Sequence, residues 1–155
     1  MAAQKPQIVD TFTINCRAGA LAADIINLSA DTIKAALFQS TSNISTSQSS
    51  YSSLTNEVAG ANGYTTGGVT LTNVSVTRDG SALEFTSDAV AWTASGGSIT
   101  ARYLVMYSDT PSNKSIILFF ELDDTPADVT ITDTNTLTVT PDVNSGWLTR
   151  TTNNA

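Results

Sequence analysis

The sequence lacks histidine altogether and has a single cysteine, Cys16, among its 155 residues. Without histidine the chain has neither the commonest general base nor the commonest zinc ligand of proteins. One cysteine can form no internal disulfide and no multi-cysteine metal site, and a catalytic thiol at Cys16 would have no histidine to deprotonate it. These absences argue against most catalytic classes. Cys16 is expected to be a small, partly buried apolar residue.

Positive charge is also scarce, with 7 Lys and Arg against 14 Asp and Glu, giving a net charge of -7. Binding of nucleic acid without sequence preference needs clustered Lys and Arg, so nucleic acid is not expected as a partner. No stretch approaches the roughly 18 consecutive apolar residues of a membrane helix, so no membrane association is expected. The first residues show no apolar stretch typical of a secretory signal.

What the chain does contain is threonine, serine and asparagine, which together supply roughly a third of its residues. Threonine favours strands, because its branched Cβ fits a pleated surface, and serine and asparagine favour turns. The length corresponds to a single domain. This composition predicts a β-protein whose surface is solvated by hydroxyls and amides more than by charges, a profile frequent in secreted and virion proteins.

Short apolar or alternating stretches separated by turn residues recur along the chain at intervals of about 8–12 residues. Their number and spacing predict an all-β fold, an antiparallel β-sandwich of the Ig-like or jelly-roll-like kind. Residues 99–107 and 115–122 are the most apolar and are expected to be central strands covered on both faces. The predicted strands and hairpins are residues 33–38, 69–76, 82–86, 90–92, 99–107, 115–122 and 129–139, with hairpin turns at Arg78-Asp79-Gly80 and at Thr134-Asn135.

Both ends of the chain are expected to differ from this β-domain. Residues 16–28 have the only helical spacing, with Leu21, Ile25 and Leu28 on one face, and residues 8–14 could form an arm or a first strand. We therefore predict an N-terminal arm with a short helix over 1–30, the sandwich over 31–141, and an extended C-terminal arm over 142–155.

The C-terminal arm carries one conspicuous apolar residue, Trp147, in an otherwise polar segment. Such a residue suggests docking, either onto the domain itself or onto a neighbouring subunit. Deletion of the residues after Pro141 is expected to leave a folded domain that no longer assembles.

Two polar segments precede the second half of the chain. Residues 39–53 are of low complexity, with Ile44 and Tyr51 as the only apolar anchors, and are expected to be mobile or ordered by a partner. In residues 54–68, Gly60, Asn62-Gly63 and Gly67-Gly68 are expected to supply the positive φ angles of tight turns.

No catalytic, cofactor-binding or metal residue is predicted, and no cofactor. The acidic residues Glu121, Asp123, Asp124 and Asp128 could offer oxygen ligands to Ca²⁺, but the EF-hand spacing is absent and Pro126 favours an ordinary solvated turn. Asp109 with Lys114, and Arg78 with Asp79, are interpreted as surface ion pairs. No serine-nucleophile or phosphate-loop motif is found in a suitable context.

Aromatic residues cluster in the predicted strands. A carbohydrate-stacking platform is one possible use of such a cluster, but filling the core is the commoner use of aromatics within strand patterns and is the one we predict. The residues concerned are Trp92, Tyr103, Tyr107, Phe119 and Phe120.

Three segments in a fixed order, DTIKAALF at 31–38, YSSLTNEVAGANGYTTGG at 51–68 and ITARYLVMY at 99–107, lie in a stretch that resembles a family of small bacteriophage virion structural proteins. The likeness extends over about two thirds of the chain, more than a single short motif could cover. It implies localisation in the virion, capsid or other virion proteins as partners, and association into a homo-oligomer. It supplies no catalytic residue.

Two functions from different classes follow from the resemblance. The first is a capsid decoration or cement protein, acting in many copies through protein–protein contacts and not as an enzyme. The alternative is a receptor- or glycan-binding module of a tail fibre, spike or other tail component, using residues 39–53 and the aromatic strands. A hydrolase would instead need an essential acid such as Glu121.

Overall fold

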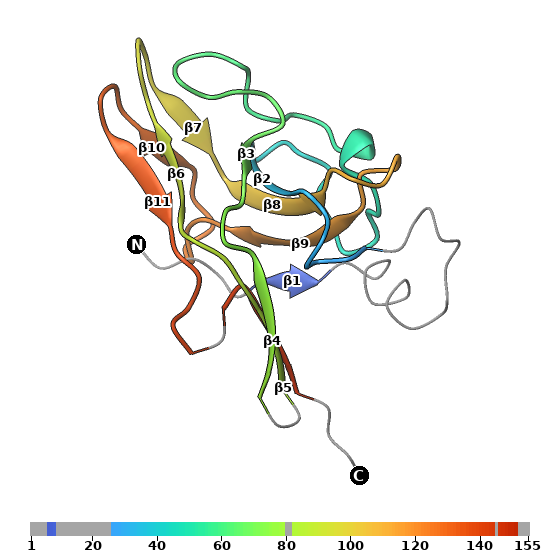
Figure 1. The fold of residues 1–155 in the computed structure, drawn as a ribbon. Coiled ribbons are helices and arrows are strands. Elements are labelled where there is room, and N and C mark those ends of the chain that lie inside the picture. The colour runs from blue at the N-terminus through green and yellow to red at the C-terminus, as the bar shows by residue number, and fades with distance from the viewer. Residues whose placement is uncertain (1–5, 9–25, 80–81, 145, 152–155) are drawn as a thin grey trace.

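The computed structural model describes residues 6–8, 26–79, 82–144 and 146–151. Antiparallel strands account for nearly all its regular structure, which confirms the all-β prediction (Figure 1). The short helix predicted at 16–28 is not seen: Ile26–Leu28 are not helical, and residues 9–25, Cys16 included, lie outside the described part. The elements are β1 (Gln7–Ile8), β2 (Ile33–Phe38), the 3-10 helix η1 (Tyr51–Ser53), β3 (Val69–Thr70), β4 (Ser75–Asp79), β5 (Ala82–Thr86), β6 (Val90–Thr93), β7 (Ile99–Ala101), β8 (Tyr103–Ser108), β9 (Ile116–Glu121), β10 (Val129–Ile131), β11 (Thr136–Val139) and β12 (Leu148–Thr151).

The central sheet has the strand order β1-β9-β8-β2-β3. Nearly every residue of β2, β8 and β9 is buried, so these strands are covered on both faces, as their continuous apolar sequences predict. The stretch 99–107 is not one strand, however. It divides at Arg102 into β7, which pairs with β10, and β8, which pairs with β2 and β9.

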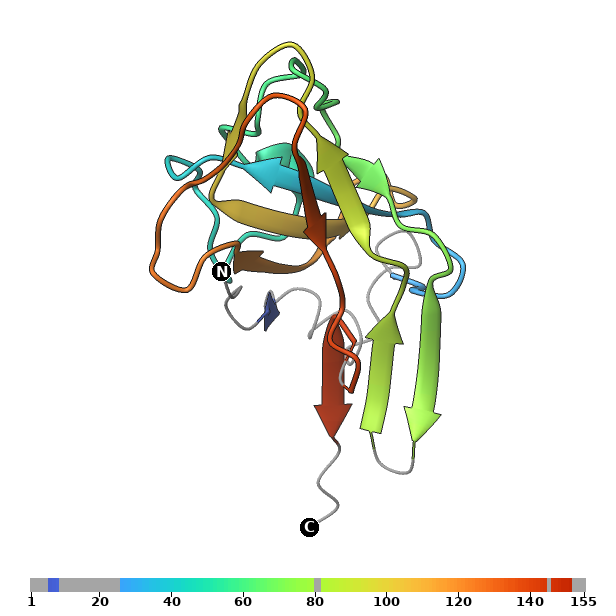
Figure 2. The same ribbon diagram turned by 90° about the vertical axis from the view of Figure 1, so that its left-hand side faces the viewer.

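Different segments cover the two faces of this sheet. On one face, Phe38 and Tyr107 contact Tyr51, which belongs to the long connection between β2 and β3. On the other face, Phe120 stacks against Trp147, which lies just before β12. The sheet is thus enclosed between a largely irregular segment and strands from the second half of the chain (Figures 1 and 2).

The predicted hairpin at 129–139 is wrong in its pairing. β10 and β11 do not pair with each other: β10 pairs with β7, and β11 pairs with β6. Two backbone hydrogen bonds, from Ala94 N–H to Asn135 O and from Thr134 N–H to Ala94 O, both 2.9 Å, link the β10-β7 pair to the β11-β6 pair. The two pairs therefore form one interrupted ribbon. Alternation of apolar and threonine residues is satisfied equally by either pairing, because a period of two fixes the buried face and not the partner strand.

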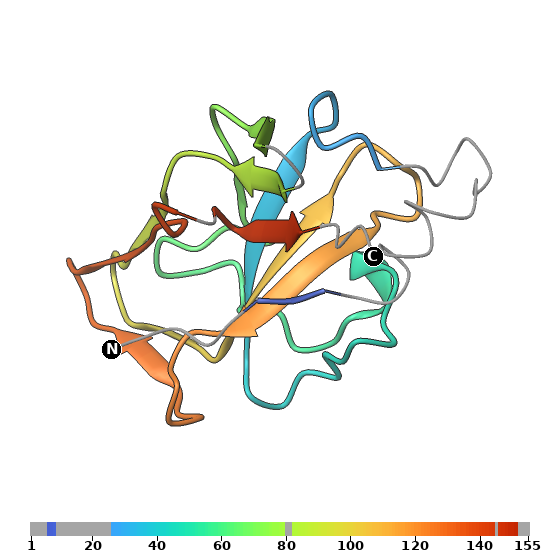
Figure 3. The ribbon, with the colours of Figure 1, turned by 90° about the horizontal axis from the view of Figure 1, so that it is seen from below.

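The three-stranded sheet β12-β5-β4 projects from the body of the molecule (Figure 2) and points toward the viewer in Figure 3. It contains the predicted hairpin of β4 and β5, whose turn residues 80 and 81 lie outside the described part. β12 pairs with β5, so residues 148–151 are built into a sheet and do not form the extended arm expected over 142–155.

Trp147 explains why the C-terminal segment returns to the domain. Its side chain is 3% exposed, stacks on Phe120, and donates from Nε1 to Ser87 Oγ at 2.8 Å. Burial of a large ring with its polar atom hydrogen-bonded is strongly favourable. Of the two docking places predicted for Trp147, the structure shows the domain itself.

Candidate functional site

The Ser-rich loop, residues 39–53, has a defined path, although we expected it to be mobile or ordered only by a partner. Asn43 ties it together by donating from Nδ2 to Ser53 O at 3.0 Å and accepting from Thr55 N–H at 2.9 Å. Asn56 Nδ2 donates to Thr41 O at 2.9 Å, and Ser50 Oγ donates to Asn113 O. The expectation of mobility considered only the apolar anchors and did not include these bonds, in which short polar side chains hydrogen-bond to backbone groups of the loop.

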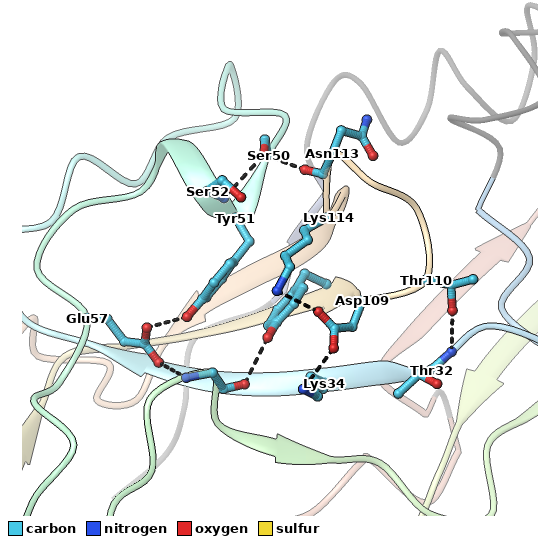
Figure 4. Close-up of polar contacts among 12 residues, drawn as sticks. Thr32, Lys34, Ser50, Tyr51, Ser52, Glu57, Asp109, Thr110, Asn113 and Lys114 are labelled. Carbon is cyan, nitrogen blue, oxygen red and sulfur yellow. Dashed lines mark hydrogen bonds and ion pairs between the residues drawn. The ribbon is translucent and has the colours of Figure 1, made fainter.

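Tyr51, at the end of this loop, is its main contact with the sheet (Figure 4). Its ring stacks on that of Tyr107, with centroids 4.1 Å apart and planes 14° apart, and lies edge-on to Phe38 at 6.0 Å. Its hydroxyl donates to the carboxylate of Glu57. The hydroxyl of Tyr107 donates to Gly67 O at 2.9 Å.

The Glu57 carboxylate collects three donors: the hydroxyls of Tyr51 and Tyr64, and the N–H of Gly67. Tyr64 also accepts from Leu37 N–H at 3.0 Å. The Leu37 N–H needs this partner because β3 pairs with β2 only at Lys34 and Ala35 and does not reach Leu37. Tyr64 thus completes the edge of β2 at Leu37. We name the set that holds the loop on the sheet the tyrosine clamp: Tyr51, Glu57, Tyr64, Gly67 and Tyr107.

Burial raises the pKa of Tyr51, Tyr64 and Tyr107 well above the ordinary value for tyrosine. For Tyr51 and Tyr64 the hydrogen bond to Glu57 raises the pKa further, and for Tyr107 the charges of Asp109 and Glu57 do so. The hydroxyls thus stay protonated and act as donors. A tyrosine that serves as a base or nucleophile needs the opposite shift, so the raised pKa values argue against these two roles for the clamp.

Asp109, just beyond β8, forms ion pairs with two lysines: Lys114 Nζ at 2.9 Å, as predicted, and Lys34 Nζ at 2.8 Å (Figure 4). The pKa of Asp109 is lowered, first by the hydrogen bond from Lys34 and then by that from Lys114. The Lys114 ammonium also lies 5.8 Å from the Tyr51 ring centroid. The ion triad of Lys34, Asp109 and Lys114 therefore adjoins the tyrosine clamp.

Replacing Asp109 with Asn is expected to remove part of the acid sensitivity of the protein. Because the folded-state pKa of Asp109 is depressed, its stabilising contribution is present above the unfolded pKa, about 3.9, and is lost as pH falls through the lower folded pKa. The free energy of unfolding by urea, measured from pH 7 to pH 2, should fall less steeply below pH 4 in D109N, with the exposed Asp124→Asn as control. Parallel curves for wild type and D109N would contradict this.

The four residues of the predicted acidic cluster do not converge on a common point. Asp128 pairs with Arg102 Nε at 2.8 Å, and Asp123 accepts from the N–H and hydroxyl of Thr125, which lower its pKa. Across the described ranges of the chain, no group of three or more Cys, Asp or Glu residues is placed to hold a metal ion. Residues 124–128 are exposed, as expected for a solvated turn.

The strand aromatics fill the core, as predicted. Trp92, Tyr107, Phe119 and Phe120 are buried and Tyr103 is partly buried, so they do not form a stacking platform on the surface. Arg78 and Asp79 are consecutive residues of β4, and their side chains lie outside the described part.

Two of the surface hollows lined by described residues are small. One, of about 200 Å³, is polar and lined by residues that include Ser40, Thr100 and Asp128. The other, of about 160 Å³, is lined largely by Phe120, Val139 and Trp147. Both are below the roughly 300 Å³ at which small-molecule sites begin, so each suits a single side chain or a sugar-sized group.

Sequence reasoning did not identify Glu57, Tyr64 or Lys34 as members of a site. Glu57 and Tyr64 lie in the segment 51–68 that carries part of the family resemblance, which was the available signal. Lys34 becomes a partner of Asp109 only because β2 pairs with β8, where Lys34 stands opposite Tyr107.

No protein-family model, curated protein or solved structure matches this chain. Nor does the part of the chain that the structure describes include a helix long and apolar enough to cross a bilayer.

Proposed function

We propose that this chain is a bacteriophage virion structural protein, of the capsid decoration or cement type, that acts through protein–protein contacts without catalysis. The support from sequence is the resemblance of residues 31–38, 51–68 and 99–107 to small virion proteins. In the structure these segments supply β2, the tyrosine clamp, β7 and most of β8. The resemblance thus lies in one connected scaffold. For its architecture we propose a β-sandwich, Ig-like or jelly-roll-like.

The observation that carries the proposal is the projecting sheet β12-β5-β4 (Figure 2). Within the described residues, β4 and β12 each have one edge without a strand partner. Exposed strand edges are templates for a strand from another chain, and proteins that do not use them normally cover them. A sheet held out from the body in this way suits contact with neighbouring coat subunits.

The polar interior supports a non-enzymatic role. The Glu57 carboxylate is occupied by three donors, and Asp109 is held by two ammonium groups. Carboxylates whose oxygens are engaged in this way are held in position and stabilise the fold. The negative net charge suits a many-copy outer layer, because it suppresses association other than at specific contacts.

The second candidate, a receptor- or glycan-binding module of a tail fibre or spike, is favoured by one observation. The polar hollow beside Ser40 combines hydroxyls with the carboxylate of Asp128, groups that hydrogen-bond to sugar hydroxyls. The buried strand aromatics offer no stacking surface to such a ligand.

Copy number separates the two candidates. Purified phage particles from the host that carries this gene should contain the chain at a copy number comparable to the major capsid protein, measured by quantitative mass spectrometry. A fibre or spike module should instead be present at a small fraction of that number. Absence of the chain from intact particles, or turnover of host polysaccharide by the purified protein, would overturn the proposal.

A further inference from the structure

Val143 is the one large apolar side chain that the described residues leave exposed, at 89%. It lies in a tight turn closed by two backbone bonds, Asp142 N–H to Gly146 O at 3.2 Å and Gly146 N–H to Asp142 O at 2.8 Å. The Asp142 carboxylate also accepts from Asn144 N–H at 2.8 Å. These bonds close the turn on either side of Val143, whose side chain is exposed to solvent.

The apolar hollow of about 160 Å³ adjoins this turn. Phe120, Val139 and Trp147 form its apolar lining, and the residues that close the turn, Asp142 and Gly146, form part of its wall. The exposed apolar side chain and the apolar hollow therefore belong to the same small area of the surface. The hollow is large enough for the three-carbon side chain of a valine.

We propose that this area binds a second copy of the same chain, with Val143 of each copy inserted into the hollow of the other about a two-fold axis. A two-fold contact is self-complementary, because it brings the same patch of both subunits together and so fills both hollows at once. An apolar anchor in a pocket at the centre of a contact is the usual arrangement of strongly binding interface residues. Val143, Phe120, Val139 and Trp147 carry no charge, whereas Asp142 in the wall of the hollow is acidic, so the attraction in this contact is apolar and not electrostatic.

This inference names one partner for the contacts proposed above, and it does not depend on the protein residing in a virion. Absence from particles would overturn the virion proposal and leave the self-contact standing. A strictly monomeric chain would overturn the self-contact and leave the virion proposal standing.

The test is sedimentation of the full chain from about 1 µM to about 1 mM, the range of weak to moderate affinities. We expect a concentration-dependent dimer. Val143→Asp should weaken dimerisation at least about tenfold, because both valines of the dimer lose their apolar contact. Thr46→Asp, an equal charge change at another exposed position, is the matched control and should dimerise like the wild type.

A second variant tests the hollow without removing a core residue. Thr140 is exposed and lines the hollow, so Thr140→Arg should obstruct it and weaken dimerisation as well. Because both substitutions act on one contact, the double variant should be little weaker than the worse single variant. A monomeric wild type, as expected if another segment of the same chain fills the hollow, or a dimer insensitive to Val143→Asp would overturn the proposal.

Discussion

Replacing Gly68 with alanine is expected to destabilise the protein by about 3 kcal/mol or more, or to prevent folding, because it combines a backbone clash with an unfavourable dihedral angle. A Cβ at this position would lie 1.9 Å from Ala35 O and 2.6 Å from Ala35 C, and φ is +72°. Ala35 belongs to β2 and pairs with Met106 of β8. Its backbone cannot move away without disrupting the central sheet.

Gly96→Ala is the matched control. Gly96 has a similar φ of +78°, but no atom lies within 4 Å of the added Cβ. Gly96→Ala should lower the free energy of unfolding only by the positive-φ penalty, about 1–2 kcal/mol. Urea unfolding followed by tryptophan fluorescence measures both variants. Equal losses in G68A and G96A would show that the close approach of residue 68 to β2 does not occur in solution.

Trp147→Ala is expected to cost about 3–5 kcal/mol, the usual range for removing a buried tryptophan. The loss includes the stacking on Phe120 and the hydrogen bond to Ser87. Trp147→Phe, which keeps an aromatic ring and loses the hydrogen bond, should retain much of this stability. Thermal unfolding followed by circular dichroism compares the two variants with the wild type.

Deleting the residues after Pro141 extends this test. The sequence predicts that the remainder stays folded, but in the structure the deletion removes β12 and uncovers Phe85 and Phe120, which are 1% and 3% exposed in the intact chain. We therefore expect the truncated chain to unfold or aggregate. A cooperative transition at the wild-type temperature would show that Trp147 and β12 are dispensable for the fold.

Local sequence patterns predicted the strands well. The stretch Ile33–Phe38 is a strand with the predicted bounds, and the glycines at 63, 67 and 68 have positive φ, although Gly60 does not. Such features depend on a few neighbouring residues: an apolar run, or a turn that only glycine enters without strain.

Strand pairing was less predictable. The alternation in residues 129–139 correctly placed Val129 and Ile131 inward, but it did not show that β10 pairs with β7 and β11 with β6. Pairing depends on which strands the whole chain brings together, and no local period records that.

The candidate site likewise has a local part that the sequence predicted and a part that depends on strand pairing. The pair of Asp109 and Lys114 is local and was predicted, whereas Lys34 reaches Asp109 only through the pairing of β2 with β8. The tyrosine clamp was missed because it requires the loop to fold back over the sheet, so that Tyr51 stacks on Tyr107.

By itself the sequence determined the all-β class, most strand positions, the inward faces and the turn glycines, because each follows from the preferences of adjacent residues. The tertiary structure alone decided the ribbon pairing, the return of the C-terminal segment as β12, the tyrosine clamp, and the placing of Val143 beside an apolar hollow. These features arise from contacts between residues far apart in the chain, and burial in a shared core selects them.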